Sequence, residues 1–183
     1  LLETLANTVK EDETKILLLV RAARIWRVEL EDTSRAERDL DRVLQIDDQN
    51  ELAAAQLEPI YEAAGDSDRL RGVCEVILSH KTQPEARRHY QLKLANLHEG
   101  PLEDVGSAFN WFAAAYKQLP EMDDVVADLE RTAALAQQWP VVVEAYQLVL
   151  ESGVDADTIL DTRLRLGRVL SKEIEDLDAA LEQ

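Results

Sequence analysis

Apolar residues recur every three or four positions along almost the whole chain, with polar residues between them. Ile16, Leu19, Ala23 and Trp26 illustrate the spacing, which places apolar side chains on one face of an α-helix. Polar clusters, glycine or proline interrupt the pattern at intervals. The pattern therefore predicts an all-α fold of about eleven helices with short polar connections.

The predicted helices pair into antiparallel hairpins. Asp32 is a good helix N-cap and Gly65 suits the left-handed residue that ends many helices. Pro59 interrupts one helical pattern, so we expect a kink there or a helix that begins later. The predicted order is a second helix of a preceding hairpin at 1–11, full hairpins at 13–47, 50–80, 82–119 and 121–152, and a truncated hairpin at 156–183.

The chain repeats itself at an interval of 72 residues. A large aliphatic residue, Glu and Asp, followed by three variable residues and Ala, occur at 30–36, 102–108 and 174–180. The unit is a helical hairpin of about 36 residues, and alternate hairpins match better than neighbours do. Because the amphipathic pattern is under way at Leu1 and continues to Gln183, we expect a single repeat array, 1–183, cut from a longer protein.

Small residues at fixed places in the hairpins resemble those of the tetratricopeptide-repeat (TPR) family. They are Ala23, Ala95 and Gly167 in the first helices, and Ala36, Ala108 and Ala180 in the second helices. Glu58 and Glu130 depart from the small-residue position in the intervening hairpins, so the resemblance is to degenerate, TPR-like repeats. It implies a right-handed α–α superhelix, a solenoid whose concave face is lined by the first helix of each hairpin.

The register of this resemblance gives a candidate partner-binding groove. One position per hairpin forms an apolar floor: Val20, Ala55, Leu92, Ala127 and Leu164. The position one turn later holds three arginines, an asparagine and a proline: Arg24, Pro59, Asn96, Arg131 and Arg168. The candidate groove residues are Val20, Leu92, Leu164, Arg24, Asn96, Arg131 and Arg168. Arginine can hold a carboxylate through two hydrogen bonds, so we predict a protein or peptide partner with an acidic segment. The alternative is that these arginines pair with neighbouring acids such as Glu62 and Glu99 and bind nothing.

Composition narrows the chemistry. The net charge of −17 argues against a nucleic-acid surface, and the absence of a long apolar run argues against membrane insertion. Cys74 is the single cysteine, which excludes an internal disulfide, and we expect it to be buried. His80, His89 and His98 are nine residues apart, without the spacing of zinc ligands on a helix. No catalytic, cofactor-binding or metal-binding residues are predicted.

These observations predict a non-enzymatic protein–protein interaction scaffold that binds a partner peptide or domain on its concave face. The alternative is a structural spacer or assembly module of a larger multidomain protein. Leu1, Leu5 and Leu181 lie on unpaired end helices and should be poorly covered, which allows self-association through uncapped ends. The sequence does not specify a compartment, and we favour the cytoplasm.

Overall fold

The computed structural model describes residues 1–182, including the backbone but not the side chain of Leu177. The chain forms two compact units, Leu1–His80 and Lys81–Gln183. The boundary lies at the predicted junction between two hairpins and separates successive copies of the 72-residue repeat.

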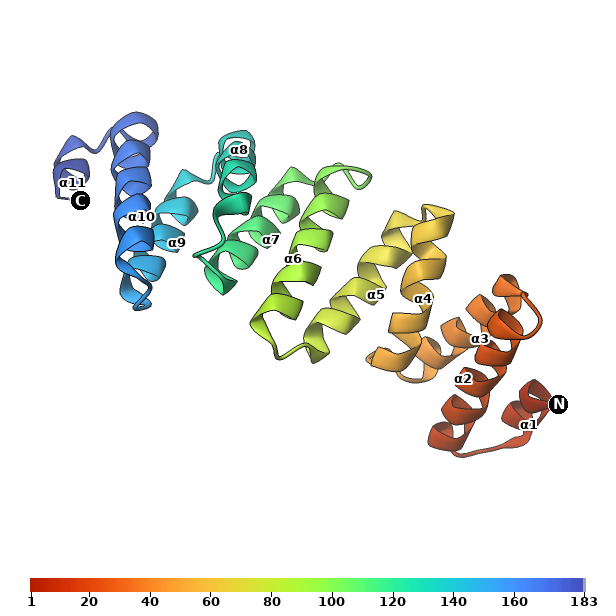
Figure 1. Ribbon diagram of the computed structural model, residues 1–183. Helices are drawn as coiled ribbons and strands as arrows, with labels where there is room; N and C mark the ends of the chain where they lie inside the picture. The colour runs from red at the N-terminus through yellow and green to blue at the C-terminus, as the bar shows by residue number, and fades with distance from the viewer. Residues whose placement is uncertain (183) are drawn as a thin grey trace. The chain divides into compact units, whose positions relative to one another are not determined.

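Unit 1 consists of five helices (Figure 1): α1 (Leu2–Thr8), α2 (Asp12–Val28), α3 (Thr33–Ile46), α4 (Glu51–Ala64) and α5 (Ser67–His80). Helices α2 and α3 form one hairpin, and α4 and α5 form the next. Helix α1 packs on α2, and α3 also packs on α4. Each helix is therefore covered by its neighbours along the chain, as expected for stacked hairpins.

Unit 2 repeats this arrangement and extends it: α6 (Pro84–Glu99), α7 (Val105–Gln118), the 3₁₀ turn η1 (Asp123–Val125), α8 (Val126–Ala136), α9 (Trp139–Glu151), α10 (Ala156–Val169), the π-helical turn η2 (Leu170–Ile174) and α11 (Leu177–Leu181). Helices α6 and α7 form a hairpin, α7 packs on α8 and α9, and α9 packs on α10. The prediction of eleven helices and no strand is confirmed for the residues that the structure describes.

Most boundaries agree with the prediction within a few residues. Helix α7 begins at Val105 rather than at Leu102, because Asp104 caps it by accepting a hydrogen bond from the Ser107 amide at 3.0 Å. Helix α4 runs through Pro59 from Glu51 to Ala64, so the expectation of a later start is wrong. Pro59 is exposed, on the side of α4 that faces away from the core.

The helix ends repeat at the interval seen in the sequence. Glu31, Glu103 and Glu175 all have left-handed backbone conformations, with φ of 52°, 52° and 62°. The residue after each is an aspartate that caps the next helix, and its amide donates to the carbonyl six residues earlier at 2.7–2.9 Å. A left-handed residue costs a non-glycine side chain about 1 kcal/mol. Its recurrence indicates that this turn sets the angle between hairpin helices.

The second type of helix end also recurs after 72 residues. Gly65 ends α4 with φ of 67°, and Gln137 ends α8 with φ of 56°. In both, the next amide donates to the carbonyl five residues earlier, which satisfies a carbonyl that the helix leaves free. The prediction that Gly65 ends its helix in a left-handed conformation is confirmed.

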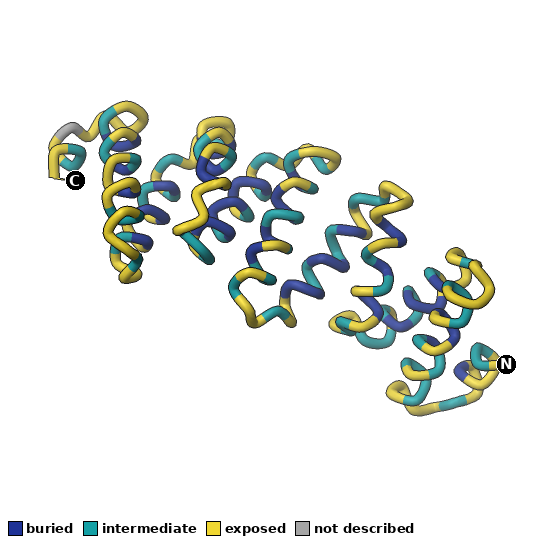
Figure 2. The backbone as a smooth tube through the Cα atoms, viewed as in Figure 1, coloured by how far each residue is buried: buried dark blue, intermediate teal, exposed yellow. Residues whose placement is uncertain are grey.

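Buried residues recur along the helices of each unit and alternate with exposed ones (Figure 2). The small TPR-like positions Ala23, Ala36, Ala95 and Ala108 are all buried, so neighbouring helices approach closely there. Cys74 is buried, as predicted. The core of unit 2 includes buried aromatic residues, and the rings of Tyr116 and Tyr146 meet edge to face at 5.5 Å. Leu1, Leu5 and Leu181 are exposed, as expected, and self-association remains a prediction.

Candidate partner-binding surfaces

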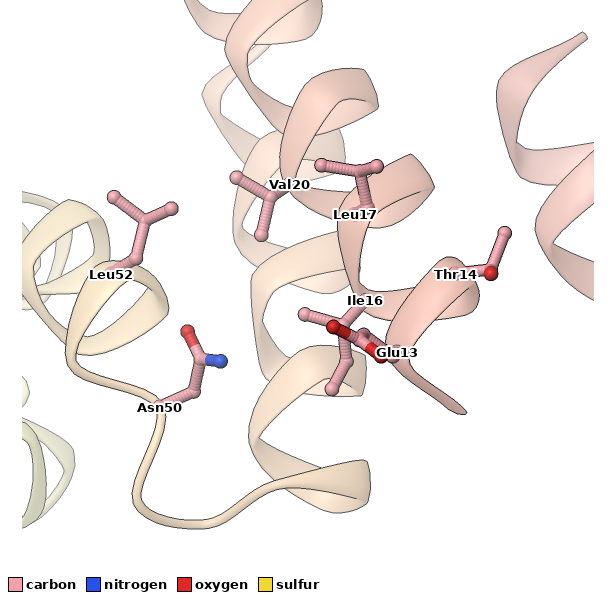
Figure 3. Close-up of a pocket in the computed structure, with 7 residues that line it drawn as sticks. All are labelled: Glu13, Thr14, Ile16, Leu17, Val20, Asn50 and Leu52. Atoms are coloured by element: carbon pink, nitrogen blue, oxygen red, sulfur yellow. The ribbon is translucent and has the colours of Figure 1, made fainter. Parts of the chain in front are cut away.

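An open groove runs along α2 and α4 of unit 1. One end holds a cavity of about 370 Å³ between the first half of α2 and the start of α4, and Figure 3 shows Val20 of α2 facing Leu52 of α4 across it. A second cavity, of about 580 Å³, continues along α2 beside Arg21, Arg24 and Arg27. The floor of the groove is aliphatic and its second half has a basic edge. This combination is suited to binding another polypeptide.

The aliphatic side chains of this groove are open to solvent. The exposed fractions are 67% for Leu17, 63% for Val28 and 59% for Leu52, while Val20 is half-buried. Exposed single aliphatic residues are common, but these line two adjoining cavities on facing helices. We define the α2/α4 groove by the residues that line the two cavities: Glu13, Thr14, Ile16, Leu17, Val20, Arg21, Arg24, Arg27, Val28, Asn50, Leu52 and Gln56.

The three arginines of the groove have no partner among the described residues, either in an ion pair or in a hydrogen bond. Arg21 and Arg24 are exposed and Arg27 is half-buried. The arginines of α3 and α5, in contrast, each have an acidic partner: Arg35, Arg38, Arg42, Arg69 and Arg71. The basic edge of the groove is thus a part of unit 1 in which positive charge is not neutralised within the fold.

The corresponding surface of unit 2, between α6 and α8, is bridged by ion pairs. Arg131 of α8 donates to both carboxylate oxygens of Glu99 on α6, one of them at 2.9 Å, and to Asp128 at 2.8 Å. The hydrogen bond from Arg131 lowers the pKa of Glu99 and raises that of the guanidinium. Arg88 of α6 pairs with Asp124 of η1. The Arg131–Glu99 pair joins α8 to α6, and the Arg88–Asp124 pair joins α6 to the turn that precedes α8.

The next surface of unit 2, between α8 and α10, is bridged in the same way. Arg168 of α10 donates to both oxygens of Glu130 on α8, one of them at 2.5 Å. Glu130 also accepts a hydrogen bond of 2.8 Å from the hydroxyl of Tyr146, so the carboxylate is held on two sides. Leu164, one turn before Arg168, is 66% exposed.

The predicted groove residues therefore have different environments. Val20 and Arg24 line the α2/α4 groove. In unit 2, Leu92 is half-buried and Asn96 exposed, while Arg131 and Arg168 pair with acids two helices earlier, on α6 and α8. The Arg131–Glu99 pair is one that the alternative interpretation named. Sequence reasoning did not select Leu17, Arg21, Arg27, Val28 and Leu52 as groove residues, although the spacing of Arg21, Arg24 and Arg27 places them along one face of a helix.

One carboxylate of unit 1 is unusually placed. Asp39 of α3 is completely buried, and its nearest cation is Arg42, at 3.6 Å. Burial, together with the neighbouring Glu3 of α1, raises the pKa of Asp39 from 3.8 to about 6. Glu3 itself accepts a hydrogen bond of 2.8 Å from Arg38. The site is structural in character, because Asp39 is closed off from solvent.

The three histidines considered as metal ligands or catalytic residues do not line the groove. His80 bonds the carbonyl of Gln49 at 2.8 Å, the ring of His89 meets that of Tyr90, and His98 is buried 3.5 Å from Asp104. Across residues 1–182, no three His, Cys, Asp or Glu side chains gather as metal ligands would. Among the described helices, none is long and apolar enough to cross a bilayer.

Comparison of the sequence with known protein families and with curated proteins found no match.

Proposed function

We propose that this chain is a non-enzymatic protein-interaction scaffold of TPR-like hairpins that binds a partner peptide or domain. The observation that carries the proposal is the α2/α4 groove, whose exposed aliphatic floor and unpaired arginines are not used within the fold. Leaving apolar side chains and charges uncovered brings unit 1 no internal stabilisation. A partner that covered both would explain why they are present.

The architecture proposed for the whole chain is the right-handed α–α superhelix that the TPR resemblance implies. The recurring helix ends support it, because the same left-handed residue and capping aspartate are found at successive 72-residue intervals. These turns give alternate hairpins a similar internal geometry, and similar hairpins that stack with similar rotations generate a superhelix. Small-angle X-ray scattering of the chain tests this part of the proposal, since a superhelix and a collapsed pair of units differ in maximum dimension.

Photo-crosslinking in an extract of the source cells tests the interaction function. A photoreactive residue replaces Leu52 in the groove, and a matched control carries it at Leu148 of α9, which is also exposed. A scaffold should give discrete adducts from position 52 that are absent from position 148. The alternative function, a structural spacer, predicts no adduct specific to the groove.

A further inference from the structure

We propose that the partner segment in the α2/α4 groove is an acidic amphipathic α-helix. The inference rests on the proposed interaction function and specifies the conformation and charge of the partner. Its starting point is charge complementarity. In a chain of net charge −17, Arg21, Arg24 and Arg27 stand together without an acidic partner among the described residues.

The unpaired state of Arg27 has a specific cause. Glu99 occupies the position of unit 2 that corresponds to Arg27, and Arg131 occupies the position of Pro59. In unit 2 the acid on one helix meets the arginine on the next, and the pair bridges the surface. Unit 1 has the cation on α2, and Pro59 and Gln56 of α4 offer it no carboxylate. A partner that supplies carboxylates at this place would complete the same kind of bridge.

The groove favours a helix over an extended peptide. An extended segment leaves its own amides and carbonyls to be bonded by the groove. The groove is lined by side chains of two helices. Asn50 caps α4 and donates to Asp47, and Gln56 donates to the carbonyl of Leu52. The three arginines can donate but cannot accept, so the groove offers few acceptors for the amides of an extended segment. A helix satisfies its backbone internally and needs only an apolar stripe facing the floor.

The dimensions set the size of the partner. From Leu17 to Val28 the groove follows α2 for eleven residues, or about 16 Å at 1.5 Å per residue. A partner helix of about three to four turns covers this length. Its aliphatic residues would contact Leu17, Val20 and Leu52, and its acidic residues would lie beside Arg21, Arg24 and Arg27. Glu13 lines the opposite end of the groove, so acidic residues there would be repelled.

Selection from a displayed library of random peptides of about fourteen residues, long enough for four helical turns, tests the inference. The chain is the bait, and each enriched peptide is then titrated by fluorescence anisotropy against two variants. One variant is Arg21→Gln with Arg24→Gln and Arg27→Gln. The matched control is Arg131→Gln with Arg168→Gln, which removes arginines that are already paired. Circular dichroism confirms that each variant keeps its helicity.

The expected result is enrichment of peptides with aliphatic residues at helical spacing and acidic residues towards one end. They should bind the α2 variant at least tenfold more weakly, because several charge-assisted contacts are lost, and bind the control variant unchanged. A proline in the middle of such a peptide should abolish binding. Added salt should weaken it.

The other outcomes distinguish a failure of the acidic-helix inference from a failure of the proposed interaction function. Enriched peptides that tolerate proline, lack acidic residues or bind the α2 variant equally well would overturn the acidic helix and leave an interaction scaffold standing. No enrichment above an unrelated bait would overturn both. Sedimentation that shows a dimer dispersed by Leu17→Asn would identify a second copy of the chain as the occupant and overturn the inference.

Discussion

The α2/α4 surface of unit 1 and the α6/α8 surface of unit 2 are built from corresponding parts of the repeat and have opposite character. In unit 2, Arg131 of α8 pairs with Glu99 of α6 and with Asp128 of its own helix. In unit 1 the corresponding positions hold Pro59, Arg27 and Gln56, and no such bridge forms. The same scaffold thus has a surface closed by its own ion pairs in one unit and an open one in the other.

The difference shows that two copies of a repeat can diverge on the surface while they keep particular core and helix-capping positions. Leu57 and Leu129 correspond in the repeat and are both fully buried, and the capping aspartates Asp32 and Asp104 correspond as well. Positions that face inward or end helices are under packing and hydrogen-bonding constraints. Positions on the exposed side of the first helices are free of them, and there the two units diverge.

The largest expected effect tests whether the two cores are equivalent. Leu57→Ala and Leu129→Ala each remove a fully buried side chain, so each should lower the free energy of unfolding by about 2–5 kcal/mol. Hydrogen exchange resolved by peptide should show the loss of protection first in the unit that carries the substitution. A much smaller effect in one unit would mean that the cores differ as well as the surfaces.

Pro59 provides the next test. Proline inside a helix costs roughly 3 kcal/mol relative to alanine, and the Pro59 side chain is exposed. Pro59→Ala should therefore raise the free energy of unfolding by up to about 3 kcal/mol, measured by urea denaturation. Arg131→Ala at the corresponding position of unit 2 is the control and should lower stability slightly. An unchanged free energy of unfolding would mean that Pro59 does not destabilise α4.

Asp39 distinguishes the units by its pH dependence, since unit 2 has Trp111 at the corresponding position. The raised pKa means that the folded state binds more protons than the unfolded state between about pH 4 and 6, so stability should fall as the pH rises through this range. Asp39→Asn should raise the free energy of unfolding at pH 7 by on the order of 2 kcal/mol and have little effect at pH 4.

The control for Asp39 is Asp68→Asn, which removes a carboxylate that is exposed on α5. Thermal unfolding of both variants across this pH range should show the pH-dependent gain for Asp39→Asn alone. An equal response of the two variants would attribute the effect to net charge rather than to burial.

A smaller effect is expected for the ion pair that closes the surface of unit 2. Glu99→Gln should lower the free energy of unfolding by about 0.5 kcal/mol at pH 7, because the pair with Arg131 is partly exposed. The pKa of Glu99 is lowered, so this contribution is present above the ordinary carboxyl pKa and is lost as the pH falls through the folded-state value. A variant equally destabilised at pH 2.5 would show that packing, not charge, was removed.

The last test introduces the ion pair of unit 2 into the open surface of unit 1. Arg27→Glu with Pro59→Arg places the acid and arginine of unit 2 in unit 1. A double-mutant cycle should give a favourable coupling of about 0.5 kcal/mol that decreases with added salt. Absence of coupling would show that α2 and α4 do not present these positions to each other as α6 and α8 do.

Local sequence determined the helices and their ends. The apolar spacing predicted eleven helices, Asp32 and Gly65 marked boundaries that the structure confirms, and the repeat interval anticipated the recurring left-handed turns at Glu31, Glu103 and Glu175. These features depend on residues within one or two turns of each other, so a periodic pattern is sufficient to find them.

The tertiary structure decided which charges are available to a partner. Arg24, Arg131 and Arg168 occupy one predicted position of the repeat, yet Arg131 and Arg168 meet Glu99 and Glu130, 32 and 38 residues earlier in the chain, and Arg24 meets no acid among the described residues. Likewise, the burial of Asp39 follows from the packing of α1 beside α2 and α3 rather than from its place in an amphipathic pattern. Ion pairing and burial depend on what the facing helix presents, and the period of a single helix does not contain that information.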